Sequence, residues 1–344
     1  MKTYVINKDG TAGVREVGIP AYNEHEALVK MISCGMCGTD VKLFHRTFKK
    51  FPESRYPLML GHEGVGEVIA VGEKVKGYKI GDKVLLPFVD ADDIEEDLDS
   101  AWGAMSEYGI VCDAASYPEG EAPDHAYAQT VLSDDIDPVD GAMIVTLREV
   151  LSCIRYMGIT KEQSIAVFGC GPVGLTYIKL LSLVGVKNII ACDIREDKLQ
   201  QAKDAGAAIT VNNQDTAVLQ REVRSLFPDG LDYAFDAAGF PAVVNQGLTL
   251  LKDRGRMVCY GVPESGTITL DFNDAEYNFQ VIYQQFPRKR EEGAAHEQIV
   301  EWIRSGDLKL EDFISDHYAF DEVDKAYQDL LDKKIRKKGI VVFR

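Results

Sequence analysis

The sequence predicts an α/β protein of two domains, one rich in β-strands and one built on a doubly wound parallel sheet. Up to about residue 138, short apolar runs are separated by Gly, Asp and Pro, which is typical of strands and turns. The middle of the chain alternates buried-type strands with helical runs, which indicates parallel strands joined by crossover helices. A length of 344 residues fits two domains.

The expected elements follow in chain order. The β-rich part holds strands, with a turn at Gly81-Asp82. The tail holds two amphipathic helices and a closing strand. The strands are expected at Met1–Ile6, Ala27–Ile32, Gly64–Val71, Lys83–Phe88, Met105–Val111, Ser164–Phe168, Asn188–Cys192, Ala207–Val211, Tyr233–Asp236, Arg256–Tyr260 and Gly339–Phe343, and the helices at Met143–Met157, Leu175–Val184, His296–Ser305 and Asp321–Asp332.

Composition excludes several classes of protein. Acidic residues outnumber basic ones by 55 to 38, and the net charge of −17 argues against a general affinity for nucleic acid. The longest apolar runs fall far short of the ~20 residues that a membrane-spanning helix needs. The N-terminus lacks the apolar core of a signal peptide. We therefore expect the seven scattered cysteines to be reduced thiols in a cytoplasmic protein.

A glycine-rich motif indicates a dinucleotide site. Gly169-Cys170-Gly171-Pro172-Val173-Gly174 matches G-x-G-x-x-G between an expected strand and an expected helix. The glycines allow a tight turn and a close approach to a pyrophosphate, which the helix N-terminus attracts. Asp193 ends the next strand and suits the ribose hydroxyls, which favours NAD over NADP. Arg195 leaves NADP open because it could pair with a 2′-phosphate.

Metal donors lie at two places in the β-rich part. Cys37 and the pair His62-Glu63 offer sulfur, nitrogen and oxygen donors that suit zinc. Cys34 and Cys37 could instead form a redox pair or half of a structural zinc site, and a lone His after Gly is commonly a loop or core residue. The acidic run of residues 90–99 lacks EF-hand spacing. It is interpreted as a solvated loop, with a weak cation site as the alternative.

Taken together, the motifs resemble the zinc-dependent medium-chain dehydrogenase/reductase family, on its polyol and sorbitol dehydrogenase side. The resemblance covers essentially the whole chain. It rests on Cys37-Gly38-Thr39-Asp40, Gly61-His62-Glu63-Gly64, Gly81-Asp82-Lys83-Val84, Gly103–Val111, the Gly169–Gly174 motif, Asp193 with Lys198, and Asp236-Ala237-Ala238-Gly239.

The resemblance implies a GroES-like β-rich catalytic domain, residues 1–138 plus 288–344, and an inserted Rossmann NAD-binding domain, residues 139–287. Zinc and substrate would lie between the two. The resemblance also assigns roles to single residues. Cys37, His62 and Glu63 would bind the zinc, Asp40 would orient the histidine, Thr39 would pass the substrate proton, and Lys198 would help to hold the adenosine ribose.

The chain departs from the family pattern at three places. The lobe that usually carries four cysteines for a structural zinc holds only Cys112, so no structural zinc is expected. Val145 stands where many relatives have a residue on or near the metal, and Glu149, one helical turn later, is the candidate to replace it. Lys42 stands where a histidine often receives the relayed proton, and His45 follows three residues later.

The sequence therefore predicts reversible oxidation of a secondary alcohol, in a polyol or sugar-derived molecule, by hydride transfer to NAD at one catalytic zinc. We expect a homodimer or homotetramer acting on a small molecule. The nicotinamide would sit near Val258–Val262. The alternatives are a zinc-free quinone or enone reductase of the same fold and a non-catalytic dinucleotide-binding module. Candidate substrate-pocket residues are Phe44, Pro87, Phe88, Trp102 and Tyr260.

Overall fold

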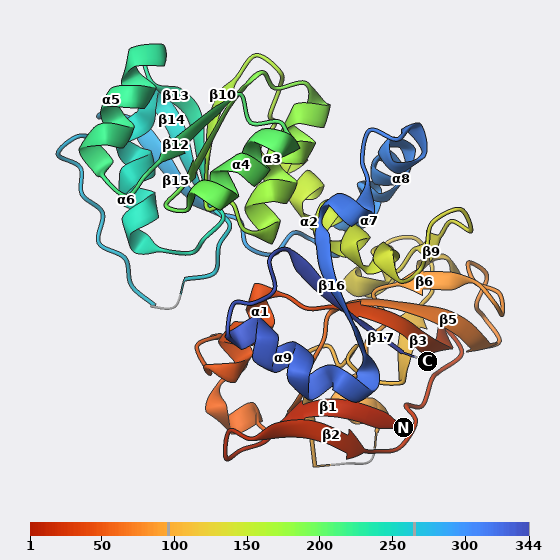
Figure 1. Ribbon diagram of the computed structural model, residues 1–344. Helices are drawn as coiled ribbons and strands as arrows, with labels where there is room; N and C mark the ends of the chain where they lie inside the picture. Colours follow the sequence, from red (N-terminus) through yellow and green to blue (C-terminus); the bar gives the residue numbers. More distant parts are fainter. Residues whose placement is uncertain (95–96, 264–265, 344) are drawn as a thin grey trace. The chain divides into compact units, whose positions relative to one another are not determined.

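The computed structural model describes residues 1–94, 97–263 and 266–343 (Figure 1). By its contacts the chain divides into two compact units, Met1–Arg148 with Arg288–Arg344, and Glu149–Pro287. The sequence predicts a first boundary after residue 138, whereas the division falls inside helix α2 (Met143–Tyr156), which begins in the first unit and ends in the second.

The second unit is built on a parallel sheet. Its strands lie in the order β12-β11-β10-β13-β14-β15, and neighbours run parallel throughout. This order is that of a doubly wound Rossmann sheet, so the predicted fold class of this part is confirmed. The strands are β10 (Ser164–Phe168), β11 (Asn188–Asp193), β12 (Ile209–Asn212), β13 (Leu231–Asp236), β14 (Leu251–Cys259) and β15 (Phe279–Tyr283).

Helices cover both faces of this sheet. Figure 1 shows α3 (Pro172–Val184) and α4 (Glu196–Ala205) on one face, and α5 (Thr216–Leu226) and α6 (Pro241–Leu250) on the other. On the second face, Leu219 and Val223 of α5 and Leu248 of α6 pack against buried side chains of the strands. This packing buries the sheet on both sides, as its nearly continuous apolar strands require.

The first unit combines two sheets. One follows the order β16-β17-β3-β5-β6-β9 with β8 paired to β3, and the other follows β2-β1-β4-β7. The C-terminal strand β17 runs antiparallel to β3, so the two ends of the chain contribute to one unit. The strands are β1 (Lys2–Ile6), β2 (Ala12–Glu16), β3 (Glu26–Gly35), β4 (Leu58–Met59), β5 (Glu63–Val71), β6 (Lys83–Leu85), β7 (Asp99–Ser100), β8 (Tyr108–Cys112), β9 (Val131–Leu132), β16 (Ile314–Ala319) and β17 (Lys338–Val342).

Helices of the first unit are short. They are α1 (Gly38–Phe44), α7 (Lys289–Ala294), α8 (His296–Ser305) and α9 (Val323–Leu331), together with the start of α2. The expected strand Lys83–Phe88 ends early, at Leu85, because Leu86 adopts a left-handed backbone with φ of 59°. A strand cannot continue through that conformation.

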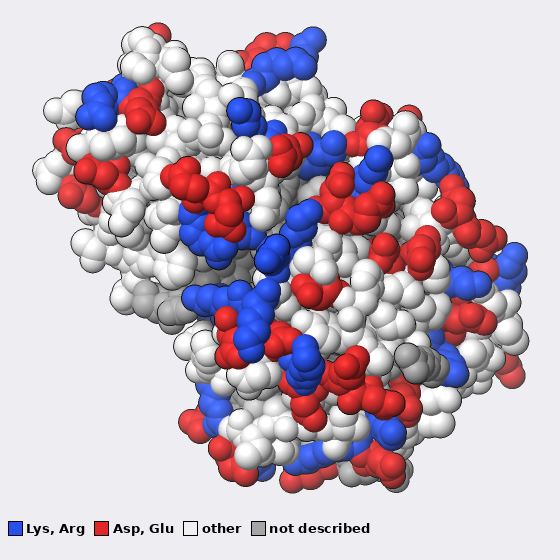
Figure 2. All heavy atoms as spheres, viewed as in Figure 1, with Lys and Arg blue, Asp and Glu red and all other residues white. Residues whose placement is uncertain are grey.

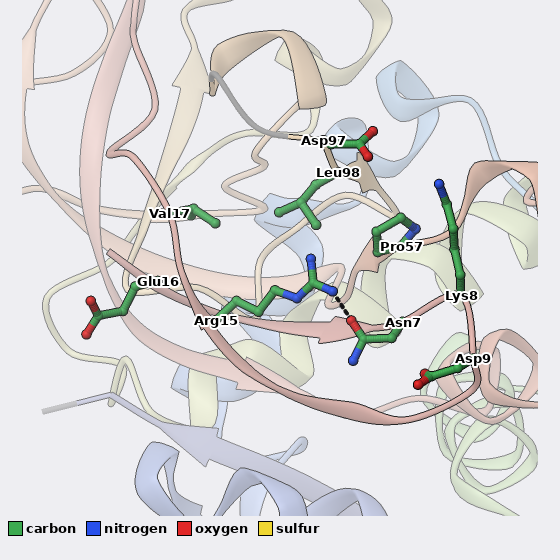
Figure 3. Close-up of a pocket in the computed structure, with 9 residues that line it drawn as sticks. All are labelled: Asn7, Lys8, Asp9, Arg15, Glu16, Val17, Pro57, Asp97 and Leu98. Atoms are coloured by element: carbon green, nitrogen blue, oxygen red, sulfur yellow. Dashed lines mark hydrogen bonds between the residues drawn. The ribbon is translucent and has the colours of Figure 1, made fainter.

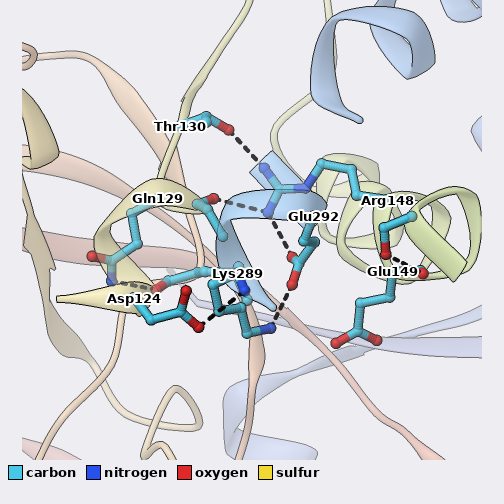
Figure 4. A network of polar contacts seen from close by, with 10 residues as sticks. Asp124, Gln129, Thr130, Arg148, Glu149, Lys289 and Glu292 are labelled. Atoms are coloured by element: carbon cyan, nitrogen blue, oxygen red, sulfur yellow. Dashed lines mark hydrogen bonds and ion pairs between the residues drawn. The ribbon is translucent and has the colours of Figure 1, made fainter. Parts of the chain in front are cut away.

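A buried ion-pair network joins three segments of the first unit (Figure 4). Arg148, which is fully buried, donates to the Glu292 carboxylate at 2.9 Å, to the Thr130 hydroxyl at 2.7 Å and to the Ala128 carbonyl at 2.9 Å. Lys289 donates to the other Glu292 oxygen at 2.5 Å. The network holds the start of α2 and helix α7 against the segment before β9, close to both points where the chain passes between the units.

The surface carries charged side chains of both signs. Figure 2 shows acidic and basic side chains interspersed over the viewed face, so the excess of acids does not gather in one area there. Among the described residues, no helix has the length and apolar character needed to cross a membrane.

Candidate active site

Two neighbouring strands bring three metal-type donors together. Cys37 follows β3 and precedes α1, while His62 and Glu63 lie at the start of β5, which pairs with β3. One donor atom from each of Cys37, His62 and Glu63 lies within 4.8 Å of the others. The turn before His62 requires Gly61, which has φ of 95°, because a Cβ there would lie 2.4 Å from the Met105 amide nitrogen.

Asp40 faces the imidazole of His62. Its Oδ1 lies 3.7 Å from His62 Nδ1, and its Oδ2 accepts a 2.8 Å hydrogen bond from the Cys37 amide. Burial raises the pKa of Asp40, although the charge of His62 opposes this. Burial lowers the pKa of His62, but Cys37 and the charge of Asp40 outweigh it and raise that pKa to about 10. With Nδ1 facing Asp40, Nε2 is the nitrogen left to face a ligand.

The carboxylate of Glu63 is held by two side chains that the sequence analysis did not identify. Lys338, at the start of β17, donates to both oxygens at 2.8 and 2.6 Å, and Thr146 donates to Oε1 at 3.0 Å. Both side chains are buried, as is Glu63. Burial raises the pKa of Glu63, and the ammonium of Lys338 more than offsets this, so that the pKa is lowered.

Thr39 lies in the first turn of α1, next to the donor cluster. Its Oγ1 is 4.0 Å from Cys37 Sγ, and the thiol donates to it. Lys42 lies in the last turn of the same helix, and His45 ends it at an exposed position. Thr39 thus brings a hydroxyl group close to the metal donors, whereas Lys42 and His45 lie at the far end of α1.

Two aromatic side chains, Trp102 and Phe51, pack beside His62. The Trp102 ring lies 5.1 Å from the His62 ring, centroid to centroid, and 5.4 Å from the Phe51 ring. Trp102 has φ of 70°, an unusual backbone conformation for a large side chain. Of the other candidate pocket residues in this unit, Phe44 packs against Tyr327 and Phe88 against His125.

The glycine motif forms the expected turn in the second unit. β10 ends at Phe168, Gly171 caps the helix, and α3 begins at Pro172 and Val173. Gly169 has φ of 87°, and a Cβ on Gly174 would lie 1.7 Å from the Gly169 carbonyl oxygen, so only glycine fits. The turn exposes the start of α3 at the carboxyl end of the sheet, next to the point where the strand order reverses.

Asp193 lies at the end of the adjacent strand and faces this turn. Its carboxylate accepts hydrogen bonds from the Cys170 amide at 2.7 Å and the Arg195 amide at 3.0 Å. The guanidinium of Arg195 pairs with Asp197 at 2.6 Å. Lys198 is buried in α4, and its ammonium donates to Gln201 at 3.2 Å. Asp193 is thus held at the glycine turn, while Arg195 is occupied by a neighbouring acid.

The acidic run is only partly described, because Glu95 and Glu96 lie outside the described residues. Within the described part, Asp99 pairs with Arg55, and burial raises the pKa of Asp93 to about 6. Asp97 lines a surface pocket together with eight other residues (Figure 3). These residues are Asn7, Lys8, Asp9, Arg15, Glu16, Val17, Pro57, Asp97 and Leu98, and they include none of the predicted site residues.

The alternative roles of Cys34 and Cys37, a redox pair or half of a structural zinc site, depend on the environment of Cys34. Cys34 is fully buried, and its thiol donates to the Gly35 carbonyl at 3.6 Å; burial raises its pKa. All seven cysteines are free thiols. Only Cys37 of these belongs to a donor cluster among the described residues.

Comparison with known proteins agrees with this site. Residues 23–122 match the alcohol dehydrogenase GroES-like domain, and residues 172–286 match the zinc-binding dehydrogenase family model. Sorbitol dehydrogenase of Bacillus subtilis (strain 168) is 24% identical over 100% of this chain and 97% of its own length. D-xylulose reductase of Saccharomyces cerevisiae is 25% identical over 94% of this chain and 92% of its own.

A solved structure shows the same fold. The crystal structure of 2R,3R-butanediol dehydrogenase from Bacillus subtilis matches with a TM-score of 0.81 at 22% identity, covering 99% of each chain. A GroES-like unit with an inserted Rossmann-type sheet defines an oxidoreductase of the alcohol dehydrogenase class. The chain belongs to the zinc-type medium-chain dehydrogenase family, which confirms the resemblance and the predicted fold class.

Proposed function

We propose that this protein is a zinc-dependent dehydrogenase that reversibly oxidises a secondary alcohol in a polyol or sugar-derived compound by hydride transfer to NAD. The observation that carries the proposal is the cluster of Cys37, His62 and Glu63 donors within 4.8 Å, with Asp40 facing the histidine. The names of the sorbitol and D-xylulose relatives support the polyol class of substrate.

The donor set suits a catalytic zinc. Cys37, His62 and Glu63 would hold the ion, and three protein ligands leave a position for water or substrate. The buried His62 Nδ1 and Asp40 Oδ1 have no hydrogen-bond partner among the described residues, and they face each other at 3.7 Å. That arrangement fits an imidazole whose other nitrogen serves a metal. When bound, zinc would supply a Lewis acid for the substrate oxygen.

The surrounding side chains have separate tasks. Thr39 accepts the proton that the alcohol loses, because its hydroxyl lies beside the cluster. Asp40 fixes the orientation of His62. Lys338 and Thr146 hold the Glu63 carboxylate in place and balance its buried charge.

The second unit binds the dinucleotide. The Gly169–Gly174 turn and the start of α3 receive the pyrophosphate, Asp193 accepts the ribose hydroxyls, and Lys198 supports the adenosine end. NAD supplies the hydride acceptor, with its nicotinamide near Val258–Val262 at the end of β14. The carboxylate of Asp193 would repel a 2′-phosphate, so NADP is the weaker cofactor.

The test is a panel of secondary alcohols, including polyols, amino alcohols and sugar acids, incubated with zinc-loaded protein and NAD and followed by NADH absorbance. We expect NADH formation that depends on zinc. Reduction of enones without zinc would favour the zinc-free reductase instead. Nucleotide binding without turnover on any substrate would favour the non-catalytic module. Neither alternative explains why Thr39 and Asp40 lie beside the donor cluster.

We also propose one catalytic zinc per chain, no structural zinc, and a homodimer or homotetramer. The first two points rest on the single donor cluster among the described residues and on the lobe that holds only Cys112. Light scattering would measure the oligomeric state.

A further inference from the structure

One lysine lies unusually close to the proposed metal site. The ammonium of Lys50 is 4.9 Å from the centre of the Trp102 ring and 5.8 Å from the centre of the Phe51 ring. Since the Trp102 ring is itself 5.1 Å from the His62 ring, the ammonium lies at most about 10 Å from the centre of His62. A group bound at the metal donors could therefore reach Lys50 through a short carbon chain.

No carboxylate among the described residues neutralises Lys50. It has no ion pair or hydrogen bond there, and its contacts are the two aromatic rings. This is notable in a chain with 55 acidic residues. The nearby cations are engaged elsewhere, Arg55 by Asp99 and Lys289 by Glu292. Lys50 is thus a cation held beside the site with its charge available.

The environment of Lys50 favours an anion as its partner. Burial lowers its pKa, and repulsion from Arg55 and Lys289 lowers it further, while Asp90 opposes the shift. Aromatic rings attract the ammonium, and because Lys50 is exposed, its N–H donors on the side away from the rings face solvent and are accessible to an incoming group. Hydrogen bonds between an ammonium and a carboxylate or phosphate are stronger than neutral ones. An incoming anion would satisfy both the charge and the donors.

The backbone conformation of Trp102 supports a functional role for the Trp102 and Phe51 side chains. A large residue at φ of 70° is strained, and such strain persists where the surrounding structure enforces it, commonly at functional sites. The indole of Trp102 lies in contact range of both the His62 ring and the Lys50 ammonium. Trp102 therefore links the proposed metal site to the cation.

We propose that Lys50 recognises an anionic group of the substrate, so that the substrate is a hydroxylated compound carrying a carboxylate or a phosphate monoester. This inference rests on the proposed dehydrogenase function and specifies its substrate class. The alcohol is oxidised at the donor cluster while the anionic end of the same molecule pairs with Lys50. Neutral polyols lack that end and bind more weakly.

The experiment compares Lys50→Met with Lys50→Arg and with the control Lys49→Met. Both lysines are exposed, and within the described part of the chain only Lys50 lies against the two rings. Each variant is assayed for kcat and KM on alditols of four to six carbons, on their terminal monophosphates and on the aldonates of equal length. Binding of the alditol monophosphates and the aldonates to zinc-loaded protein without NAD is measured by calorimetry, which needs no turnover.

Wild-type protein should favour one anionic series over the neutral alditols by about tenfold or more, because hydrogen bonds between ionised groups are stronger than neutral ones. Lys50→Met should remove this preference, mainly through KM, and should weaken calorimetric binding by a similar factor. Lys50→Arg should restore most of it, and Lys49→Met should match wild type. The preferred series identifies the anion as carboxylate or phosphate.

The inference is overturned if wild-type protein oxidises neutral alditols as well as both anionic series, or if Lys50→Met lowers kcat/KM equally for all three. Absence of turnover on every compound contradicts the proposed function instead. In that case the calorimetry still decides the inference, because anion binding that is insensitive to Lys50→Met excludes it.

Discussion

The thiol of Cys37 is the softest donor of the proposed zinc site, and its replacement is the most direct test at the scale of single residues. Cys37→Ala should lower the bound zinc at least about tenfold and abolish turnover, because two ligands hold zinc far less tightly than three. The fold should persist, since Cys37 is only partly buried. Metal analysis and far-UV circular dichroism measure the two effects.

Cys34→Ala is the matched control. Cys34 lies three residues away, is buried and is outside the donor cluster, so this variant should keep its zinc and its turnover. Wild-type zinc content in Cys37→Ala would show that the ligand assignment is wrong.

Glu63 and Glu149 compete as the third protein ligand. Glu63 lies in the cluster with Cys37 and His62, while Glu149 belongs to the second unit. Glu63→Gln should lower zinc retention and kcat at least about tenfold, because an amide oxygen is a weaker ligand than a carboxylate. Glu149→Gln should change neither. Loss of zinc in Glu149→Gln with retention in Glu63→Gln would reverse the assignment.

Removal of the Glu63 charge also takes away the carboxylate that pairs with the buried ammonium of Lys338. The double variant Glu63→Gln with Lys338→Met separates the two effects. It should recover stability towards urea relative to Glu63→Gln alone but should not recover zinc. Recovery of zinc in the double variant would mean that Glu63 acts only as a partner of Lys338.

Asp193 should determine the choice of nicotinamide cofactor. Asp193→Ala should lower kcat/KM with NAD at least about tenfold through loss of hydrogen bonds to the ribose, and should raise the ratio of NADP to NAD activity. Arg195→Ala should leave NAD activity near that of wild type, because Arg195 pairs with Asp197 in the structure. Steady-state assays with both cofactors measure the ratio. A wild-type preference for NADP would show that Arg195 outweighs Asp193.

The sequence alone could identify part of this site. Cys37, His62 and Glu63 have recognisable donor chemistry, and their neighbours carry a recognisable motif. Lys338 could not be found in this way, because it lies 275 residues from Glu63 and follows two other basic residues, Arg336 and Lys337. Its role arises only when β17 pairs with β3. Thr146 could not be found from the sequence either, because it lies 83 residues from the Glu63 carboxylate to which it donates.

At the scale of elements, the Arg148–Glu292 pair should matter for stability. Arg148→Met removes one of the two cations that pair with the buried Glu292 carboxylate in the described part of the chain and leaves Lys289, so the free energy of unfolding should fall by up to about 3–5 kcal/mol, the cost of breaking a buried ion pair. Glu292→Gln should cost a similar amount. Urea unfolding of these variants measures the free energy of unfolding.

The double variant Arg148→Met with Glu292→Leu is the control for this pair. It should be more stable than either single variant, because no charge of the pair remains buried alone. Additive losses in the double variant would show that the two side chains act independently of each other.

The fully buried strands of the parallel sheet were predicted well, whereas several helices, among them α5 and α6, and the half-exposed strands were not. The expected strand Ser164–Phe168 coincides with β10, because every residue in it is apolar or small and buried. Helix α4 was not predicted, since it buries only Lys198, Leu199 and Ala202 and is otherwise polar. Strand β15 was also missed; none of its residues is fully buried, and Gln280 and Tyr283 are exposed, so no clear alternation marks it.

At the scale of the whole molecule, the described ends of the acidic lobe are held by polar contacts instead of thiolates. Arg55 pairs with Asp99 at one end of the lobe. At the other end, the Asp93 carbonyl accepts a 2.9 Å hydrogen bond from the Ala21 amide. These contacts tie the described ends of the lobe to the first unit, and we predict that the unit keeps its fold without a zinc ion there.

Metal analysis of the purified wild-type chain should therefore give about one zinc per chain, the number expected of a catalytic site alone. Chelation should abolish turnover and shift thermal unfolding only modestly, because the first unit keeps its own buried core around β1 and β4. Re-addition of one equivalent of zinc should restore turnover. Two tightly held zinc ions per chain, or unfolding of the first unit on chelation, would show that the acidic lobe has kept a structural metal despite its lost cysteines.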